Sequence, residues 1–69
     1  MLGTFFTRVR EEVRAQGLKL GDFERSIGVS VGYFSRTQRH NSTPSLLIAL
    51  EISKTLGVSL DYLCGGDKT

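Results

Sequence analysis

The chain has 69 residues, nine of them Lys or Arg and seven Asp or Glu, which gives a formal net charge of +2 at pH 7. A chain this short buries only about 60% of its unfolded surface, so it has room for one hydrophobic core and none for a cleft between domains, which argues against an enzyme. One cysteine excludes an internal disulfide, one cysteine with one histidine are too few for a zinc site, and no stretch approaches the ~20 apolar residues of a membrane span.

Charge and cysteine content bear on the binding partners and on the cellular compartment of the protein. The sequence pI is about 9.0, which is compatible with binding to phosphate groups without requiring it. A small secreted domain normally carries several cysteines, so a single one fits a reducing cytoplasm. We expect one soluble cytoplasmic domain over residues 1–69, with its core over about 4–64, a frayed tail over 65–69, no metal and no cofactor.

The first expected helix covers residues 4–16. The apolar residues that recur there at helical spacing are Phe5, Phe6, Val9 and Val13. Gly17 follows them and is suited to end the helix. The other side of this helix carries both signs of charge and is expected to face solvent; its residues are Arg8, Arg10, Glu11, Glu12 and Arg14.

A second helix is predicted over residues 20–27. Leu20, Phe23 and Ile27 recur at the spacing of one helix face, which predicts that this face is buried. Gly28 is suited to the left-handed backbone conformation that commonly ends a helix. The second helix is therefore short and ends at Gly28.

The third helix is predicted over residues 31–38, directly after this stop. Ser30 is suited to cap its first turn, and Phe34 is its clearest inward-facing residue. Only residues 28–30 then separate the second and third helices. A connection this short, with Gly28 at its first position, forces a sharp angle between them, which is the geometry of a helix-turn-helix.

The fourth helix is predicted over residues 44–56, with Thr43 as its cap, Pro44 at its first position and Gly57 as its stop. The residues expected to form its buried stripe are Leu46, Ala49, Leu50, Ser53 and Leu56. The apolar residues expected outside this stripe or at its border are Leu47, Ile48 and Ile52. This helix is thus apolar nearly all round.

A short fifth helix is expected after Ser59, its predicted cap. Val58 and Leu63 flank its start as a hydrophobic staple, and Gly65 and Gly66 close it. With no alternating strand pattern in the sequence, we predict an all-α fold, a compact bundle of five short helices with a helix-turn-helix formed by the second and third.

Three stretches of sequence follow one another at compatible spacing: FERSIGVSVGYF over residues 23–34, YFSR over 33–36, and TPSL over 43–46 followed by LGVSLDYL over 56–63. Together they resemble the Cro/cI-type family of helix-turn-helix regulators, also called the XRE family. The resemblance covers residues 6–66. It implies the lambda-repressor-like fold, with the third helix in the major groove of double-stranded DNA.

The chain departs from the family pattern at several positions. Glu24 stands where the family usually has alanine, where the third helix crosses closely over the second. Its carboxylate is therefore expected to swing outward or to pair with Arg25 or Arg36. The other departures, which bear on how the third helix docks, are Lys19, Thr37 and His40.

The resemblance implies that four residues on the exposed face of the third helix read base edges: Val31, Gly32, Ser35 and Arg36. Arg36 is the strongest candidate, because a guanidinium can donate two hydrogen bonds to guanine, worth about 1–3 kcal/mol of discrimination. Val31 is suited to a thymine methyl group. Gly32 either lets the backbone approach the duplex closely or leaves the first turn frayed.

Residues at the edges of the groove are expected to bind phosphate groups, which supply most of the affinity for DNA. They combine helix N-termini, that of the third helix included, with hydroxyl groups and basic side chains. The candidates are Arg10, Lys19, Ser30, Tyr33, Arg39, Asn41, Ser42 and Thr43. Each also has a plain structural interpretation, as a helix cap, a rim residue of the core or a solvated surface group.

The fourth helix predicts an interaction surface. A helix that is apolar nearly all round needs more cover than one small bundle provides. We expect Leu47 and Ile48, with Tyr62, to contribute to a homodimer or partner interface. A dimer places two reading helices about 34 Å apart, which suits an inverted-repeat operator.

The sequence therefore predicts a sequence-specific DNA-binding transcriptional regulator, most simply a repressor that binds its operator as a homodimer. One alternative is the antitoxin of a toxin–antitoxin pair, which would bury the apolar face against a small protein partner. Another is a protein-interaction module that has lost DNA binding, favoured by the glycine at a reading position and the modest net charge. Catalysis is not expected, because the residue types of a triad do not converge in the predicted elements.

Overall fold

The structure, a computed structural model, describes residues 2–40 and 42–66. These ranges hold five helices, and no strand: α1 (Leu2–Ala15), α2 (Leu20–Ser26), α3 (Tyr33–Arg39), α4 (Leu46–Leu56) and α5 (Leu60–Leu63). The predicted all-α bundle of five short helices is thus confirmed. Over the same ranges, no helix has the length and apolar character needed to cross a membrane. Asn41 and residues 67–69 of the expected tail lie outside the described residues.

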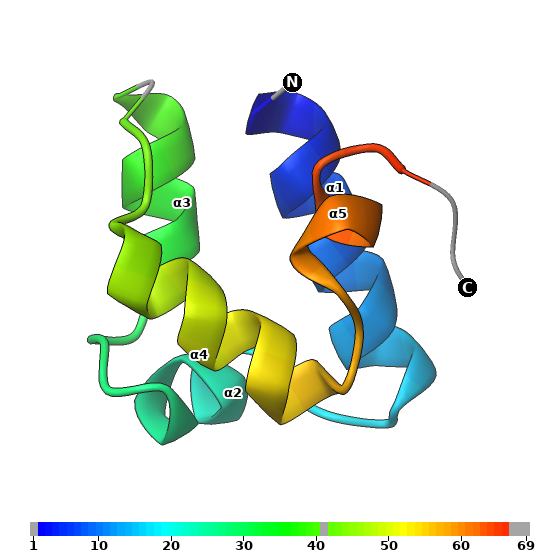
Figure 1. Cartoon of the computed structure of the whole chain (residues 1–69). Helices are drawn as coiled ribbons and strands as arrows, with labels where there is room; N and C mark the ends of the chain where they lie inside the picture. The colour runs from blue at the N-terminus through cyan, green and yellow to red at the C-terminus, as the bar shows by residue number, and fades with distance from the viewer. Residues whose placement is uncertain (1, 41, 67–69) are drawn as a thin grey trace.

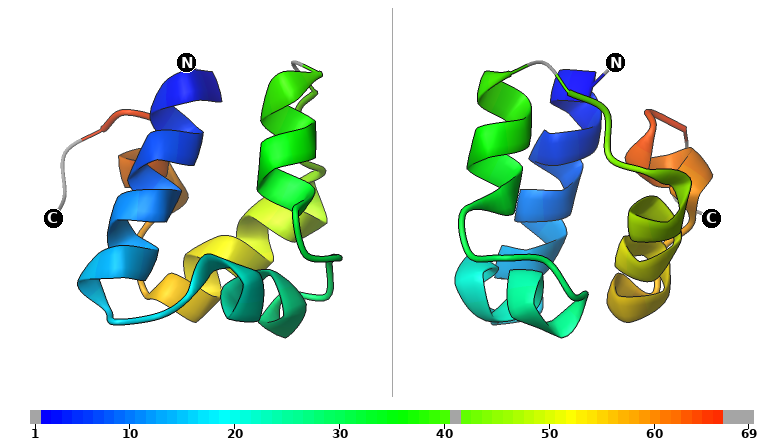
Figure 2. Two further views of the ribbon diagram at one scale, coloured as in Figure 1. Left: turned by 180° about the vertical axis from the view of Figure 1, so that it is seen from behind. Right: turned by 90° about the vertical axis from the view of Figure 1, so that its left-hand side faces the viewer.

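Helix α1 is the centre of the bundle and packs against each of the other four helices. Figures 1 and 2 show α3 beside α1 and running in the opposite direction, with α2 at the end where α1 ends and α3 begins. Helices α4 and α5 form a second layer, which lies in front of α1 and α3 in the view of Figure 1 and is seen separately in the right-hand view of Figure 2. Helix α3 is therefore at the edge of the bundle, with one side against α1 and another side open.

The core takes apolar side chains from all five helices. Its buried members are Phe5, Phe6, Val9, Val13, Phe23, Ile27, Phe34, Ile52, Leu56 and Leu63. Phe34 is fully buried, and its ring lies 5.9 Å from that of Phe6 on α1 and 6.2 Å from that of Phe23 on α2. This one side chain therefore anchors α3 to two other helices, as its predicted inward orientation requires.

Helix α4 begins at Leu46, later than the predicted Pro44. Its N-cap is Ser45, whose Oγ accepts a hydrogen bond of 3.2 Å from the backbone N–H of Ile48. The prediction that Thr43 caps this helix was wrong. Ser45 has the extended backbone that an N-cap needs, so the helix starts after it and Pro44 stays outside.

Replacing Ser45 by alanine is expected to lower the free energy of unfolding by about 1 kcal/mol, because the Ile48 N–H loses its acceptor. Thr43→Ala is the matched control and is expected to change it by less than about 0.5 kcal/mol. Urea unfolding followed by circular dichroism measures both. Equal losses in the two variants would contradict this assignment of the cap.

The buried stripe of α4 differs from the predicted one. Ile52 is fully buried and Ile48 packs against the core, although both were expected outside the stripe or at its border. Leu46, Leu47 and Leu50, which we call the leucine face, are 69%, 74% and 40% exposed. The inward placement predicted for Leu46 and Leu50 was therefore wrong, because a helix apolar on most sides offers two stripes with the same spacing.

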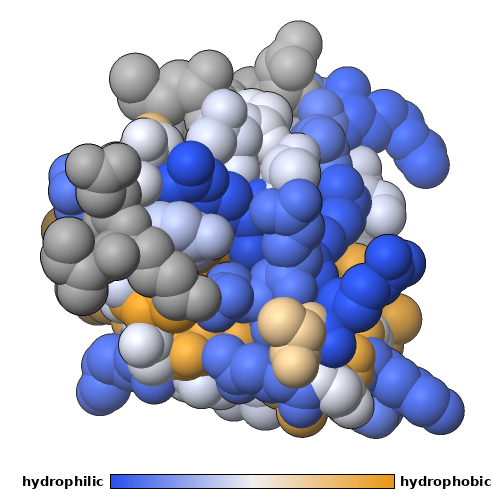
Figure 3. Space-filling view, turned by 90° about the vertical axis from the view of Figure 1, so that its right-hand side faces the viewer, coloured by the Kyte–Doolittle hydropathy of each residue, from blue (hydrophilic) through white to orange (hydrophobic). Residues whose placement is uncertain are grey.

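Two charged residues of α1 that were expected on a solvent face belong to the packing instead. Arg8 is half-buried and donates hydrogen bonds to the backbone carbonyls of Tyr62 and Gly66, with its guanidinium 4.5 Å from the Tyr62 ring centre. Glu12 is buried. Arg8 thus ties the end of α5 to α1. The face of the molecule on the right-hand side of Figure 1 is largely hydrophilic, with apolar residues gathered in a band across its lower part (Figure 3).

Candidate nucleic-acid interface

The connection between α2 and α3 is longer than predicted and covers residues 27–32. Gly28 has a φ of +87°, in the left-handed region expected of the residue that stops α2. Gly32 is left-handed too, with a φ of +91°, and it is the N-cap of α3. Helix α3 therefore begins at Tyr33, and the predictions that it starts at residue 31 and that Ser30 caps it were wrong.

The cap of α3 comes from α2. Glu24 is only 2% exposed, and its two carboxylate oxygens accept hydrogen bonds of 2.9 Å from the backbone N–H groups of Gly32 and Phe34. The first turn of a helix leaves N–H groups without partners, and Gly32 has no side chain to receive them. A carboxylate is favoured there because it also faces the positive end of the helix dipole.

This arrangement corrects two expectations. Glu24 neither swings outward nor pairs with an arginine, since Arg25 pairs with Asp22 at 2.9 Å. The N-terminus of α3, also expected to bind phosphate, already holds the Glu24 carboxylate and is not open to another anion. Glu24 was recognised in the sequence as a departure from the family pattern, but its role as the cap of α3 was not predicted. The signal was a glycine at the start of a helix that follows a glutamate on the preceding one.

Arg36 folds over the outer side of the same turn. Its Nη1 donates to the carbonyl of Val31 at 3.1 Å and its Nη2 donates to Ser30 Oγ at 2.5 Å. A Cβ atom at Gly32 would lie 2.9 Å from Arg36 Nη1, so the missing side chain makes room for the guanidinium. Both hydrogen bonds are exposed to water, and exchanging them for bonds to another polar partner therefore costs little.

The residues predicted to read bases lie on one outer surface, which we call the reading surface. It consists of Val31, Gly32, Ser35 and Arg36. Ser35 and Arg36 lie on the exposed side of α3, whereas Val31 and Gly32 precede the helix. Val31 is 51% exposed and would be 3.6 Å from a Cβ at Gly21, so its side chain partly covers the first turn of α2.

The residues predicted to bind phosphate lie on several elements, and Ser30 among them contacts Arg36 of the reading surface. The exposed ones are Lys19, Ser30, Arg39, Ser42 and Thr43. Tyr33 is half-buried, with its ring 5.4 Å from that of Phe34. Arg10 is also half-buried and donates a hydrogen bond to Gln38 Oε1 on α3. Asn41, predicted with this group, lies outside the described residues.

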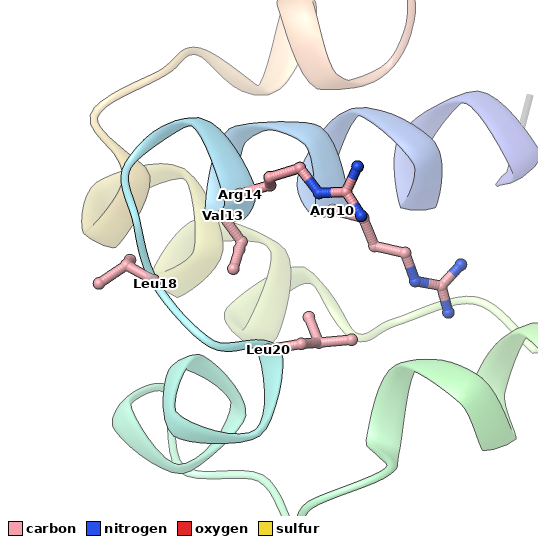
Figure 4. Close-up of a pocket in the computed structure, with 5 residues that line it drawn as sticks. All are labelled: Arg10, Val13, Arg14, Leu18 and Leu20. Atoms are coloured by element: carbon pink, nitrogen blue, oxygen red, sulfur yellow. The ribbon is translucent and has the colours of Figure 1, made fainter.

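A cleft of about 310 Å³ lies between α1, the loop that follows it and the start of α2 (Figure 4). Its lining residues are Arg10, Val13, Arg14, Leu18 and Leu20. Arg10 and Arg14 are one helical turn apart on α1, and their side chains extend in the same general direction, one beyond the other, in Figure 4. Arg14 was not predicted as a site residue. Its spacing from Arg10 was the available signal, because residues four apart share one side of a helix.

The three residues predicted for a partner interface differ in their exposure. Leu47 is the most exposed residue of the leucine face, as predicted, whereas Ile48 packs against the core and Tyr62 is half-buried beneath Arg8. A mostly apolar groove of about 370 Å³ adjoins the leucine face at Leu46. The groove is lined by Phe5, Thr43, Pro44, Leu46, Ala49, Leu60 and Cys64. Leu47 therefore belongs to an exposed apolar surface on α4, and Ile48 is half-buried next to it in the chain.

Comparison of the chain with protein-family models, with curated proteins and with solved structures gives no match. Within residues 2–40 and 42–66, no three His, Cys, Asp or Glu side chains are grouped so that they could hold a metal ion. The features that bear on function are therefore the reading surface and the residues that hold α3, Phe34 and Glu24.

Proposed function

We propose that this protein is a sequence-specific DNA-binding transcriptional regulator that places α3 in the major groove, in the manner of the family it resembles. The observation that carries the proposal is the two-sided character of α3. Phe34 fixes its inner side to the core, whereas Ser35 and Arg36 face outward. Base recognition needs polar side chains on a rigid element, so that their donors meet the base edges in a fixed register.

The distribution of basic side chains supports the same proposal. Arg39 lies in the last turn of α3, Lys19 directly precedes α2, and Arg10 and Arg14 border the cleft between α1 and α2. Positive groups on a reading helix and on the helices next to it are suited to the phosphate backbones that flank the major groove. In this proposal they position the protein, and the reading surface selects the sequence.

We propose further that two copies act together, as a repressor on an inverted-repeat operator. One helix reads few base pairs, whereas two helices about 34 Å apart read two half-sites. The leucine face supplies an apolar surface for the second copy. An antitoxin is the second candidate, because a small toxin protein would use the same leucine face; a second small protein co-purifying from the native operon would favour it.

Selection of bound duplexes from a random pool tests the proposal. The expected result is an enriched sequence with two-fold symmetry, bound with an affinity that falls steeply as salt is raised, because phosphate contacts release counterions. Titration of unselected duplex at low salt gives the non-specific affinity for comparison. No enrichment and no salt-dependent binding would contradict DNA binding and favour an interaction module.

Replacing Leu47 by glutamate is expected to shift the protein from dimer to monomer, because a carboxylate would be buried without a partner in the interface. Thr55→Glu adds the same charge at another exposed position of α4 and is expected to leave the dimer intact. Sedimentation velocity over a range of concentrations distinguishes the two. A monomeric parent protein at high concentration, or equal behaviour of both variants, would contradict the role of the leucine face.

A further inference from the structure

We propose that Glu24 is a positioning residue for DNA recognition, which sets the direction of α3 and so determines where Ser35 and Arg36 meet the base edges. This inference rests on the proposed function. Glu24 itself is buried beneath the turn and cannot touch the duplex while it holds the cap. Its effect on DNA binding is therefore exerted through the start of α3.

Glu24 holds the start of α3 through two hydrogen bonds. One Glu24 oxygen binds the N–H of Gly32, before the helix, and the other binds the N–H of Phe34, inside its first turn. Two bonded points on either side of the helix start fix its direction as well as its position. Both bonds are buried or partly buried and involve a charged acceptor, which makes them stronger than bonds between neutral groups.

The outer side of the turn is held differently from the inner side. Arg36 holds this side by donating to Ser30 and to the Val31 carbonyl. When Arg36 turns to a base, those two bonds are given up. The inner side stays held by Glu24 and by the backbone bond of 3.1 Å from the Tyr33 N–H to the Ser30 carbonyl. In the free protein both Glu24 and Arg36 hold the turn, whereas in the DNA-bound protein the Arg36 bonds are lost. The conformation of the turn therefore depends more on Glu24 when DNA is bound.

A positioning residue and a merely stabilising residue have different effects on DNA binding. A residue that only stabilises the fold would, once the variant is folded, leave the ratio of affinities for selected and random duplex unchanged. A residue that directs α3 changes this ratio, because base contacts depend on register whereas phosphate contacts tolerate small rotations. The affinity ratio is therefore the quantity to measure.

The test compares Glu24→Gln with Glu51→Gln, which makes the same charge change at an exposed position of α4. The glutamine keeps one oxygen but turns an N–H₂ group toward a backbone N–H, so one of the two bonds is lost. Affinities are measured for a duplex selected by the parent protein and for a random duplex, at a temperature where circular dichroism shows the variants folded. We expect Glu24→Gln to lower the affinity ratio about tenfold, and Glu51→Gln to leave it unchanged.

A second measurement uses the parent protein and does not depend on the variant folding. Amide hydrogen exchange is followed for Gly32 and Phe34 with and without the selected duplex. We expect both amides to stay protected in the complex, whereas faster exchange on binding would overturn the inference. A folded Glu24→Gln with an unchanged affinity ratio would overturn it as well and leave the proposed function intact. If the parent protein selects no duplex at all, the proposed function fails, and this inference fails with it.

Discussion

Replacing Phe34 by alanine is expected to unfold most of the protein at room temperature. Phe34 is fully buried and its ring contacts those of Phe6, Phe23 and Tyr33. Truncating a buried phenylalanine costs about 3–5 kcal/mol, and a single core in a domain this small rarely supplies more than about 3–5 kcal/mol of stability. The helical circular dichroism signal and its urea dependence measure the effect.

Phe34→Leu is the matched control for this prediction. It keeps most of the apolar volume, so the variant is expected to stay folded with a lower urea midpoint. A folded Phe34→Ala protein that loses less than about 1 kcal/mol would show that α3 is not anchored through this residue. Rigid presentation of the reading surface would then have no structural basis.

Replacing Arg36 by alanine is expected to relax the preference at one base step of the selected duplex and to weaken binding to that duplex by about 1–3 kcal/mol. The reason is the loss of a bidentate donor to a guanine edge. The free protein is expected to keep its stability within about 0.5 kcal/mol, because the hydrogen bonds of Arg36 to Ser30 and Val31 are exposed to water. Repeating the duplex selection with the variant measures the change.

Arg39→Ala is the control, since Arg39 is exposed in the last turn of the same helix and is proposed to bind phosphate. It is expected to weaken binding to all duplexes by a similar factor and to reduce the slope of log affinity against log salt by about 1. If Arg36→Ala behaved in the same way, Arg36 would be a phosphate contact and the assignment of the reading surface would be wrong.

The number and order of the helices could be predicted because their signals are local. The spacing of apolar residues identified the central part of each helix. Gly17, Gly28 and Gly57 marked the ends of α1, α2 and α4. The cap at Ser59 was also predicted correctly, as its Oγ accepts from the Tyr62 N–H at 3.0 Å. In each case the relevant groups lie within one turn of one another, so neighbouring residues contain the information.

The start of α3 could not be predicted in this way, because its cap comes from another helix. The serine at position 30 satisfies the local rule for a cap, yet its hydroxyl accepts from Arg36 while Glu24 takes the N–H groups of the first turn. A long-range hydrogen bond of this kind leaves no pattern in the adjacent sequence. It also changes the candidate site, because Gly32 becomes the residue before the helix and not part of its first turn.

The prediction of which side of α4 faces the core was wrong for a different reason. Ile48, Ile52 and Leu56 follow helical spacing as well as Leu46, Leu50 and Ser53 do, so spacing alone cannot decide which stripe faces the core. Contacts with α1 and α5 decide it. The predicted interface consequently included Ile48, which is half-buried against the core, and omitted Leu46 and Leu50, which are exposed.

Mapping of backbone amide shifts during titration with the selected duplex tests most directly whether α3 is the DNA-binding element. We expect the largest amide shift changes at Ser35, Arg36 and Arg39, and smaller changes at Lys19 and along α1 near Arg14. Changes confined to the leucine face of α4, or none at any residue at low salt, would contradict it.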